Sequence, residues 1–197
     1  MRNRFKRIFK KLFLPIILIA VSSGCGPAPL PAASVHFNQP ANQLADATFK
    51  LYQDPGRQFG LQYPATWLAA QSKNSPGATH FVNVATPNAA DRVVVTVMVQ
   101  GPTHDLNKVA SAAQQTIADQ AGVAELALVS EQGIEVNGLH GVEHVLYFTL
   151  SGQSMAQQIV YLVHPEHTFA LSLMCRRDKL PTYAPLFAAI LRSFNVP

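Results

Sequence analysis

Two histidines and a glutamate in the stretch His140-Gly-Val-Glu143-His144 match the H-x-x-E-H pattern of one class of zinc peptidases. That chemistry needs the two imidazoles one helical turn apart, so that they converge on one zinc ion. Here the motif follows an Asn-Gly pair and runs into Val-Leu-Tyr-Phe-Thr-Leu, which is typical of a β-strand. In a strand the two histidines would lie about 13 Å apart, and Glu143 would point to the opposite face. We therefore expect neither a zinc site nor peptidase activity at this motif.

A second histidine pair, His164 and His167, flanks a Pro-Glu dipeptide in a predicted hairpin turn. Two imidazoles in one turn could approach each other and hold zinc or copper weakly. The alternative is that both are solvated turn residues. We therefore treat His164 and His167 as weak metal candidates and predict no metal centre.

Other catalytic patterns find no support in the sequence. The chain has no G-x-S-x-G segment, no glycine-rich phosphate loop and no acidic run of the EF-hand kind. Cys175 ends an apolar run and is expected to be a buried small residue rather than a reactive thiol. The sequence predicts no catalytic residue and no cofactor, and we expect a protein that is not an enzyme.

The elements that would carry these residues alternate in the manner of strands joined by tight turns. Asn137-Gly138 is a strong hairpin signal because both residues tolerate positive φ. The return strand would place His140 and His144 on one mostly apolar face, towards a covering layer, with Val142, Leu146, Phe148 and Leu150. Strands are expected near residues 49–52, 59–63, 80–86, 92–100, 127–136, 139–150, 156–163 and 168–175.

Two amphipathic segments complete the pattern. Asp105 is a candidate N-cap for a helix that runs to Gly122, and Leu180 to Phe194 closes the chain, with regular helix expected mainly after Pro185. Helices that cover an antiparallel sheet of about six to seven strands form an α+β sandwich. That fold class is the one we predict.

The beginning of the chain has a different character. A basic start, Met1 to Lys11, precedes an apolar run that is too short to span a bilayer, and small residues then lead into Cys25. This order resembles a bacterial lipoprotein signal, which implies cleavage before Cys25 and a diacylglyceryl group on its thiol. We expect a signal peptide over 1–24, a flexible Pro- and Ala-rich tether over 25–48 and one domain over 49–197. The expected location is the extracytoplasmic side of a bacterial envelope membrane.

Charge gives no sign of a nucleic-acid partner. Of the 15 Lys and Arg residues, six lie in the expected signal peptide, which leaves nine against 11 acidic residues and a formal net charge of −2. The basic balance of the whole chain is therefore a targeting feature. The cluster Arg176-Arg177-Asp178-Lys179 is interrupted by an acid and is expected to be a solvated loop.

The segment from Phe59 to Trp67 carries a family resemblance. A strand that runs into Tyr63-Pro64-Ala-Thr-Trp67, with the later Asn137-Gly138 turn and a closing helix, resembles the PsbP-type fold over roughly residues 48–197. The resemblance implies an α/β/α sandwich in which Tyr63, Pro64, Trp67, Asn137 and Gly138 are structural. The superfamily includes PsbP of photosystem II, its lipoprotein relatives in cyanobacteria and DcrB-type envelope lipoproteins, none known as an enzyme.

These observations favour a non-catalytic, lipid-anchored module that acts through protein contacts or supports assembly. In a phototroph, the resemblance points to photosystem II as the partner. A carrier of a small apolar ligand is the alternative, and an enzyme is the least favoured reading.

Overall fold

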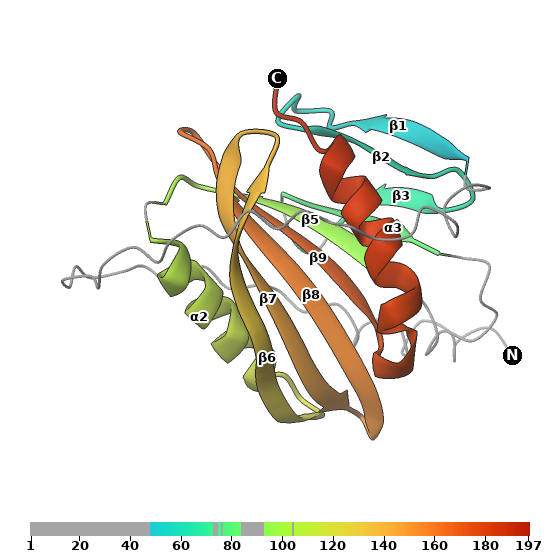
Figure 1. Ribbon diagram of the computed structural model, residues 1–197, viewed down its shortest axis with the longest axis vertical. Coiled ribbons are helices and arrows are strands. Elements are labelled where there is room, and N and C mark those ends of the chain that lie inside the picture. The colour runs from blue at the N-terminus through green and yellow to red at the C-terminus, as the bar shows by residue number, and fades with distance from the viewer. Residues whose placement is uncertain (1–47, 73–74, 76, 84–92, 104) are drawn as a thin grey trace, which may run out of the picture.

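The structure is a computed structural model that describes residues 48–72, 75, 77–83, 93–103 and 105–197. The described part contains a two-stranded sheet, a seven-stranded sheet and two α-helices (Figure 1). The small sheet pairs β1 and β2, and the large sheet has the order β3-β4-β5-β9-β8-β7-β6 with every pair antiparallel. The elements are β1 (Phe49–Gln53), β2 (Gly60–Pro64), β3 (Leu68–Gln71), β4 (Ala78–Val82), β5 (Val94–Gln100), α2 (Leu106–Ala118), β6 (Val123–Val136), β7 (Leu139–Leu150), β8 (Gln153–Val163), β9 (Thr168–Arg176), the 3-10 helix η4 (Arg177–Lys179) and α3 (Leu180–Ser193).

The helices lie on opposite faces of the large sheet (Figure 1), so the molecule is an α/β/α sandwich. Alternation along each strand decides which side chains meet which helix. On the α2 side, Leu146, Ile159 and Tyr161 pack beneath the helix. On the α3 side, Phe169, Leu171 and the other inward residues of β9 and β5 form the larger core. The predicted α+β class, with about six to seven antiparallel strands covered by helices, is confirmed.

Two turns use the positive-φ geometry that a tight hairpin requires. Asn137 and Gly138 have φ of 49° and 83° between β6 and β7, as the sequence predicted. Ser151 and Gly152 have φ of 51° and 83° between β7 and β8. The two turns fix the register of three long neighbouring strands.

Helix α2 begins where the sequence placed its cap. The Asp105 carboxylate accepts a hydrogen bond of 3.0 Å from the backbone N–H of Lys108, which satisfies one of the free donors at the helix start. Ala110 and Ile117 are buried against the sheet. Helix α2 packs mainly on β6, β7 and β8.

Several sequence-based boundaries were wrong. Helix α2 ends at Ala118 rather than at Gly122, and β8 begins at Gln153 rather than at residue 156. Helix α3 begins at Leu180 rather than after Pro185, because Pro181 suits the first turn, and burial of Phe187, Ile190 and Leu191 offsets the hydrogen bond that Pro185 cannot make. Strand β3 was not predicted, since its sequence Leu-Ala-Ala-Gln has no β-branched residue and Leu68 is exposed. Strand β6 begins at Val123, four residues before the expected start.

Strand β6 contains two register shifts, between Ala124 and Ala127 at its unpredicted start and between Leu128 and Ser130 further along. Such shifts mark β-bulges, which place an extra residue on one strand. A bulge breaks the alternation of apolar and polar residues, so the strand pattern in this part of the sequence was obscured.

None of the helices in the described residues is long and apolar enough to cross a membrane.

Candidate functional site

The H-x-x-E-H motif lies on β7, as the sequence predicted. Its two histidines and its glutamate have different surroundings. His140 is exposed, with 79% of its side-chain surface accessible. His144 is buried beneath α2, and Glu143 is buried on the opposite face of the strand. Such a spread cannot close around one metal ion. Across the described residues, no group of three or more His, Cys, Asp or Glu is arranged to hold a metal.

His144 is held by one helix residue and one strand residue. Its Nδ1 lies 3.0 Å from Nε2 of Gln114 on α2, and its Nε2 lies 3.2 Å from Oε2 of Glu131 on β6. An amide nitrogen can only donate, so Nδ1 accepts and the proton of a neutral imidazole sits on Nε2. Nε2 is close to the Glu131 carboxylate, but the geometry is not that of a hydrogen bond. Burial lowers the pKa of His144 below its ordinary value, and the neighbouring Glu131 opposes that shift only in part. The arrangement suits a neutral histidine that joins α2 to the sheet.

Glu143 has a different set of partners on the other face. Its carboxylate accepts hydrogen bonds from the side-chain amides of Gln132 on β6 and Gln158 on β8, the latter at 2.6 Å. Gln158 is itself buried. The three side chains therefore form a polar bridge across three adjacent strands. The sequence did not indicate this bridge, because the two glutamines are 11 and 15 residues away from Glu143.

His164 and His167 lie in the β8–β9 turn, as expected. Their rings are nearly parallel, at 17° with centroids 6.1 Å apart, and both lie edge-on to Phe169. Nδ1 of His164 accepts from the backbone N–H of Glu166 at 3.3 Å. Both rings are half-buried and packed on Phe169. The proposal that these two histidines form a weak metal site stays a prediction.

The aromatic residues of the family-like segment lie in the core. Tyr63 is 7% exposed and its ring lies 4.8 Å from that of Phe81, while Trp67 is 3% exposed. Lys50 fixes the bend after β2, since its Nζ donates to the carbonyl oxygens of Ala65 and Trp67 at 2.9 and 3.0 Å. Pro64 ends β2 and accepts from the Trp67 N–H.

The Asn137-Gly138 turn is also attached to the closing helix. Nδ2 of Asn137 donates to the carbonyl oxygens of Phe194 at 2.6 Å and of Arg192 at 3.0 Å. These carbonyls lie at the C-terminal end of α3, where backbone acceptors lack partners within the helix. Asn137 therefore supports both a turn and a helix end, and the sequence pattern suggested only the turn.

The two cysteines lie in different parts of the chain. Cys25, the expected lipidation site, lies outside the described residues. Cys175 is buried in the core on the α3 side, and burial, with the nearby Asp178 carboxylate, raises the pKa of its thiol to about 11. At neutral pH this thiol is protonated and therefore a poor nucleophile.

The basic cluster after β9 is not a loop. Arg177 to Lys179 form η4, and the guanidinium of Arg177 stacks on the ring of Tyr147 at 4.0 Å from its centroid. Arg176 pairs with Asp178, with Nε 3.1 Å from Oδ1. The sequence did not indicate this contact between Arg177 and Tyr147, because Tyr147 lies on β7, far from Arg177 along the chain.

Known proteins match this chain in fold and not in sequence. No family model matches the sequence, and no curated protein matches it. Among solved structures, the cyanobacterial PsbP (CyanoP) of Synechocystis sp. PCC 6803 is similar with a TM-score of 0.59 at 16% identity, over 81% of this chain and 99% of that one. This chain has a PsbP-like fold. The resemblance noted at the Tyr-Pro-Ala-Thr-Trp segment is thereby confirmed for the fold.

Two further solved structures share the PsbP-like fold. LpqN of Mycobacterium tuberculosis, described as involved in cell envelope biogenesis, is similar with a TM-score of 0.56 at 14% identity, over 85% of this chain and 99% of that one. A protein of Bacteroides thetaiotaomicron reaches 0.52 at 13% identity, over 75% of this chain and 48% of that one. At these identities the likeness concerns the fold.

Proposed function

We propose that this chain is a membrane-anchored extracytoplasmic lipoprotein whose PsbP-like domain acts without catalysis, as an assembly or protein-interaction module. The observation that carries the proposal is the shared fold with CyanoP and with LpqN, a protein involved in cell envelope biogenesis. The N-terminal signal ending at Cys25 supports the same location. In a phototroph the partner would be photosystem II.

The side chains that resemble catalytic groups have structural roles. His144 and Glu143 are both engaged by amide side chains, and Cys175 has a raised pKa. Each of these groups is therefore used in packing or in a polar bridge. This arrangement favours a module that works by contact over an enzyme.

The anchor can be tested on the full chain. We expect the wild-type protein to fractionate with membranes and to begin, by mass spectrometry, at an acylated Cys25. Cys25→Ser should keep the signal peptide and lose the acyl mass, because the lipoprotein peptidase acts only after the thiol is modified. A single lipid chain anchors marginally and two or more anchor stably, so the wild-type protein should stay with membranes through a salt wash. A wild-type chain that is soluble and begins at another residue would contradict the lipoprotein part of the proposal.

The interaction part can be tested separately by native mass spectrometry after gentle detergent extraction from the source cells. A stoichiometric protein partner is the expected result. Retention of a small apolar molecule instead would favour the carrier alternative. The described interior on the α3 side is filled by contacting rings, with Phe169 and Phe194 at 5.2 Å and Phe59 and Phe194 at 5.8 Å between centroids, so no observation favours that alternative.

A further inference from the structure

A hollow of about 770 Å³ opens where the β7–β8 turn meets η4. This hollow, which we call the Arg177 pocket, is lined by Gly152, Gln153, Ser154, Arg176, Arg177 and Asp178. Its two sides come from segments that are distant in the sequence and meet only in the folded domain. The H-x-x-E-H motif and the histidine turn contribute no residue to its lining.

Arg177 is the group in this pocket that is best prepared to bind an anion. Its guanidinium carbon lies over the Tyr147 ring, 4.0 Å from the ring centroid, and this cation–π contact restrains the side chain before any ligand arrives. A stacked guanidinium keeps its N–H donors in its own plane, at its free edges. That planar fork matches the oxygens of a phosphate group, and prior restraint reduces the entropy lost on binding.

The charge of the lining is positive. Two arginines stand against one acid, Asp178, whose two carboxylate oxygens already lie 3.1 and 3.4 Å from Nε and Nη2 of Arg176. Asp178 is therefore largely compensated by Arg176, and the charge of Arg177 remains. The chain after residue 24 has a formal net charge of −2, so this local positive charge is not part of a generally basic surface.

The side of the pocket that the β7–β8 turn forms leaves room for a ligand. Gly152 has a φ of 83°, a conformation the turn requires, and no atom lies within 4 Å of where a Cβ would be. The next residues, Gln153 and Ser154, are exposed and polar. A phosphate has enough oxygens to meet the Arg177 fork and the Ser154 hydroxyl together, and the volume exceeds that of a bare phosphate ion.

We propose that the Arg177 pocket binds the phosphate group of a small polar phosphoester. Two sources share this chemistry, namely a soluble phosphoester and the headgroup of an anionic phospholipid. The inference does not depend on lipidation of Cys25, and it adds a small-molecule site to the module.

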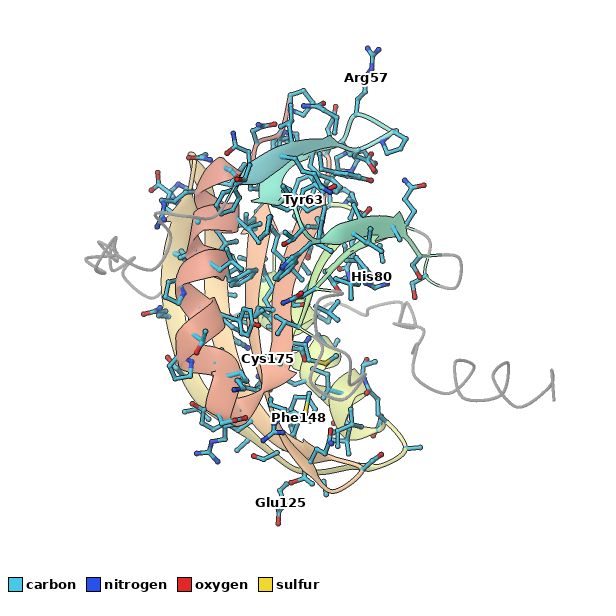
Figure 2. All side chains as sticks on the ribbon, turned by 90° about the vertical axis from the view of Figure 1, so that its right-hand side faces the viewer. Arg57, Tyr63, His80, Glu125, Phe148 and Cys175 are labelled. Atoms are coloured by element: carbon cyan, nitrogen blue, oxygen red, sulfur yellow. The ribbon has the colours of Figure 1, made fainter. Side chains whose placement is uncertain are left out.

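The probe is sn-glycerol 1-phosphate, titrated by calorimetry into the full chain in a non-ionic detergent. We expect saturable binding with a Kd on the order of 1 mM, as suits an open, partly solvated site. Arg177→Gln should weaken it about tenfold or more, because charge-assisted hydrogen bonds are lost. Arg57→Gln is the matched control, since Arg57 points away from the body of the molecule at the β1–β2 turn (Figure 2) and should leave binding unchanged.

A second pair of variants leaves the Arg177–Tyr147 stack intact. Ser154→Asp puts a negative charge into the pocket and should abolish binding, whereas Ser154→Asn is of similar size and neutral and should bind within about threefold of wild type. Phosphatidylglycerol in the micelles, compared with phosphatidylcholine, identifies the source. Competition by phosphatidylglycerol would assign a lipid headgroup, and its absence would assign a soluble phosphoester. No saturable binding, or equal losses in Arg177→Gln and Arg57→Gln, would overturn the proposal.

Discussion

The two faces of the large sheet differ in how many apolar side chains are buried on them. On the α3 side, twenty buried residues of the described part form one cluster that is rich in aromatic rings and also includes residues of β2. On the α2 side, the buried cluster has six residues, among them Ala110 and Tyr161. Because hydrophobic stabilisation scales with the apolar area removed from water, the α3 side holds most of the stability of the domain.

Buried polar groups add to the difference between the two faces of the sheet. Strand parity places His144, Tyr161 and Thr168 on the α2 side of the sheet. Within the described residues, the hydroxyls of Tyr161 and Thr168 are buried without a hydrogen-bond partner. A buried polar group left without any hydrogen-bond partner costs about 1–3 kcal/mol. The α2 layer is therefore the weaker side and the side that should respond to pH.

The largest effect is expected on the α3 side. Trp67→Ala should reduce the free energy of unfolding by about 3–5 kcal/mol, because the substitution removes a 3%-exposed ring and leaves a cavity. Urea denaturation followed by far-ultraviolet circular dichroism measures it. Unchanged stability together with loss of a bound protein would instead make Trp67 a binding hot spot.

One substitution can be made in both helices. Ile190 on α3 and Ile117 on α2 both face the sheet, at 0% and 8% exposure. We expect Ile190→Ala to cost about 4 kcal/mol and Ile117→Ala about 2 kcal/mol, since the cost grows with the cavity that the neighbours cannot fill. Equal costs in denaturant unfolding would mean that the two layers are equally well packed, contrary to the comparison.

The two hairpin turns provide a smaller, local contrast. Asn137→Ala should cost about 1–2 kcal/mol, because the side chain donates to two carbonyls at the end of α3 as well as holding a positive φ. Ser151 occupies a turn of the same geometry, but among the described residues its side chain makes no hydrogen bond to a helix end, so Ser151→Ala should cost about 1 kcal/mol less. Thermal unfolding of both variants tests this order, and a reversed order would show that the contact with α3 is not stabilising.

The smallest effect is a pH dependence on the α2 side. The folded-state pKa values of His144 and His80 are both lowered by burial, so the unfolded chain binds more protons below about pH 6.5. Stability should therefore be fully present above neutral pH and should fall as the pH drops through 6.5. His144→Gln should flatten that decline between pH 7.5 and 5.5, whereas His140→Gln, at an exposed position of the same strand, should leave it unchanged. An unaltered slope in His144→Gln would show that other groups control the decline.

Much of the fold could be predicted from the sequence, because local chemistry decides it. The Asn-Gly pair defined the hairpin of β6 and β7, a β-branched run defined β5, and Asp105 defined the start of α2. The failures have local causes too. Strand β3 has no strand-forming residues, the bulges of β6 disturb its alternation, and Pro185 conceals a helix that tertiary packing completes.

The sequence alone determined that the H-x-x-E-H motif would lie on a strand with its side chains divided between two faces, since side-chain alternation is a property of any strand. Only the tertiary structure decided what those side chains meet, namely Gln114 on α2 for His144 and two glutamines on adjacent strands for Glu143. The same holds for the Arg177 pocket, which joins a turn and a helix start about 25 residues apart. Residue spacing encodes local geometry, whereas contacts between distant segments depend on strand order and on which face each helix covers.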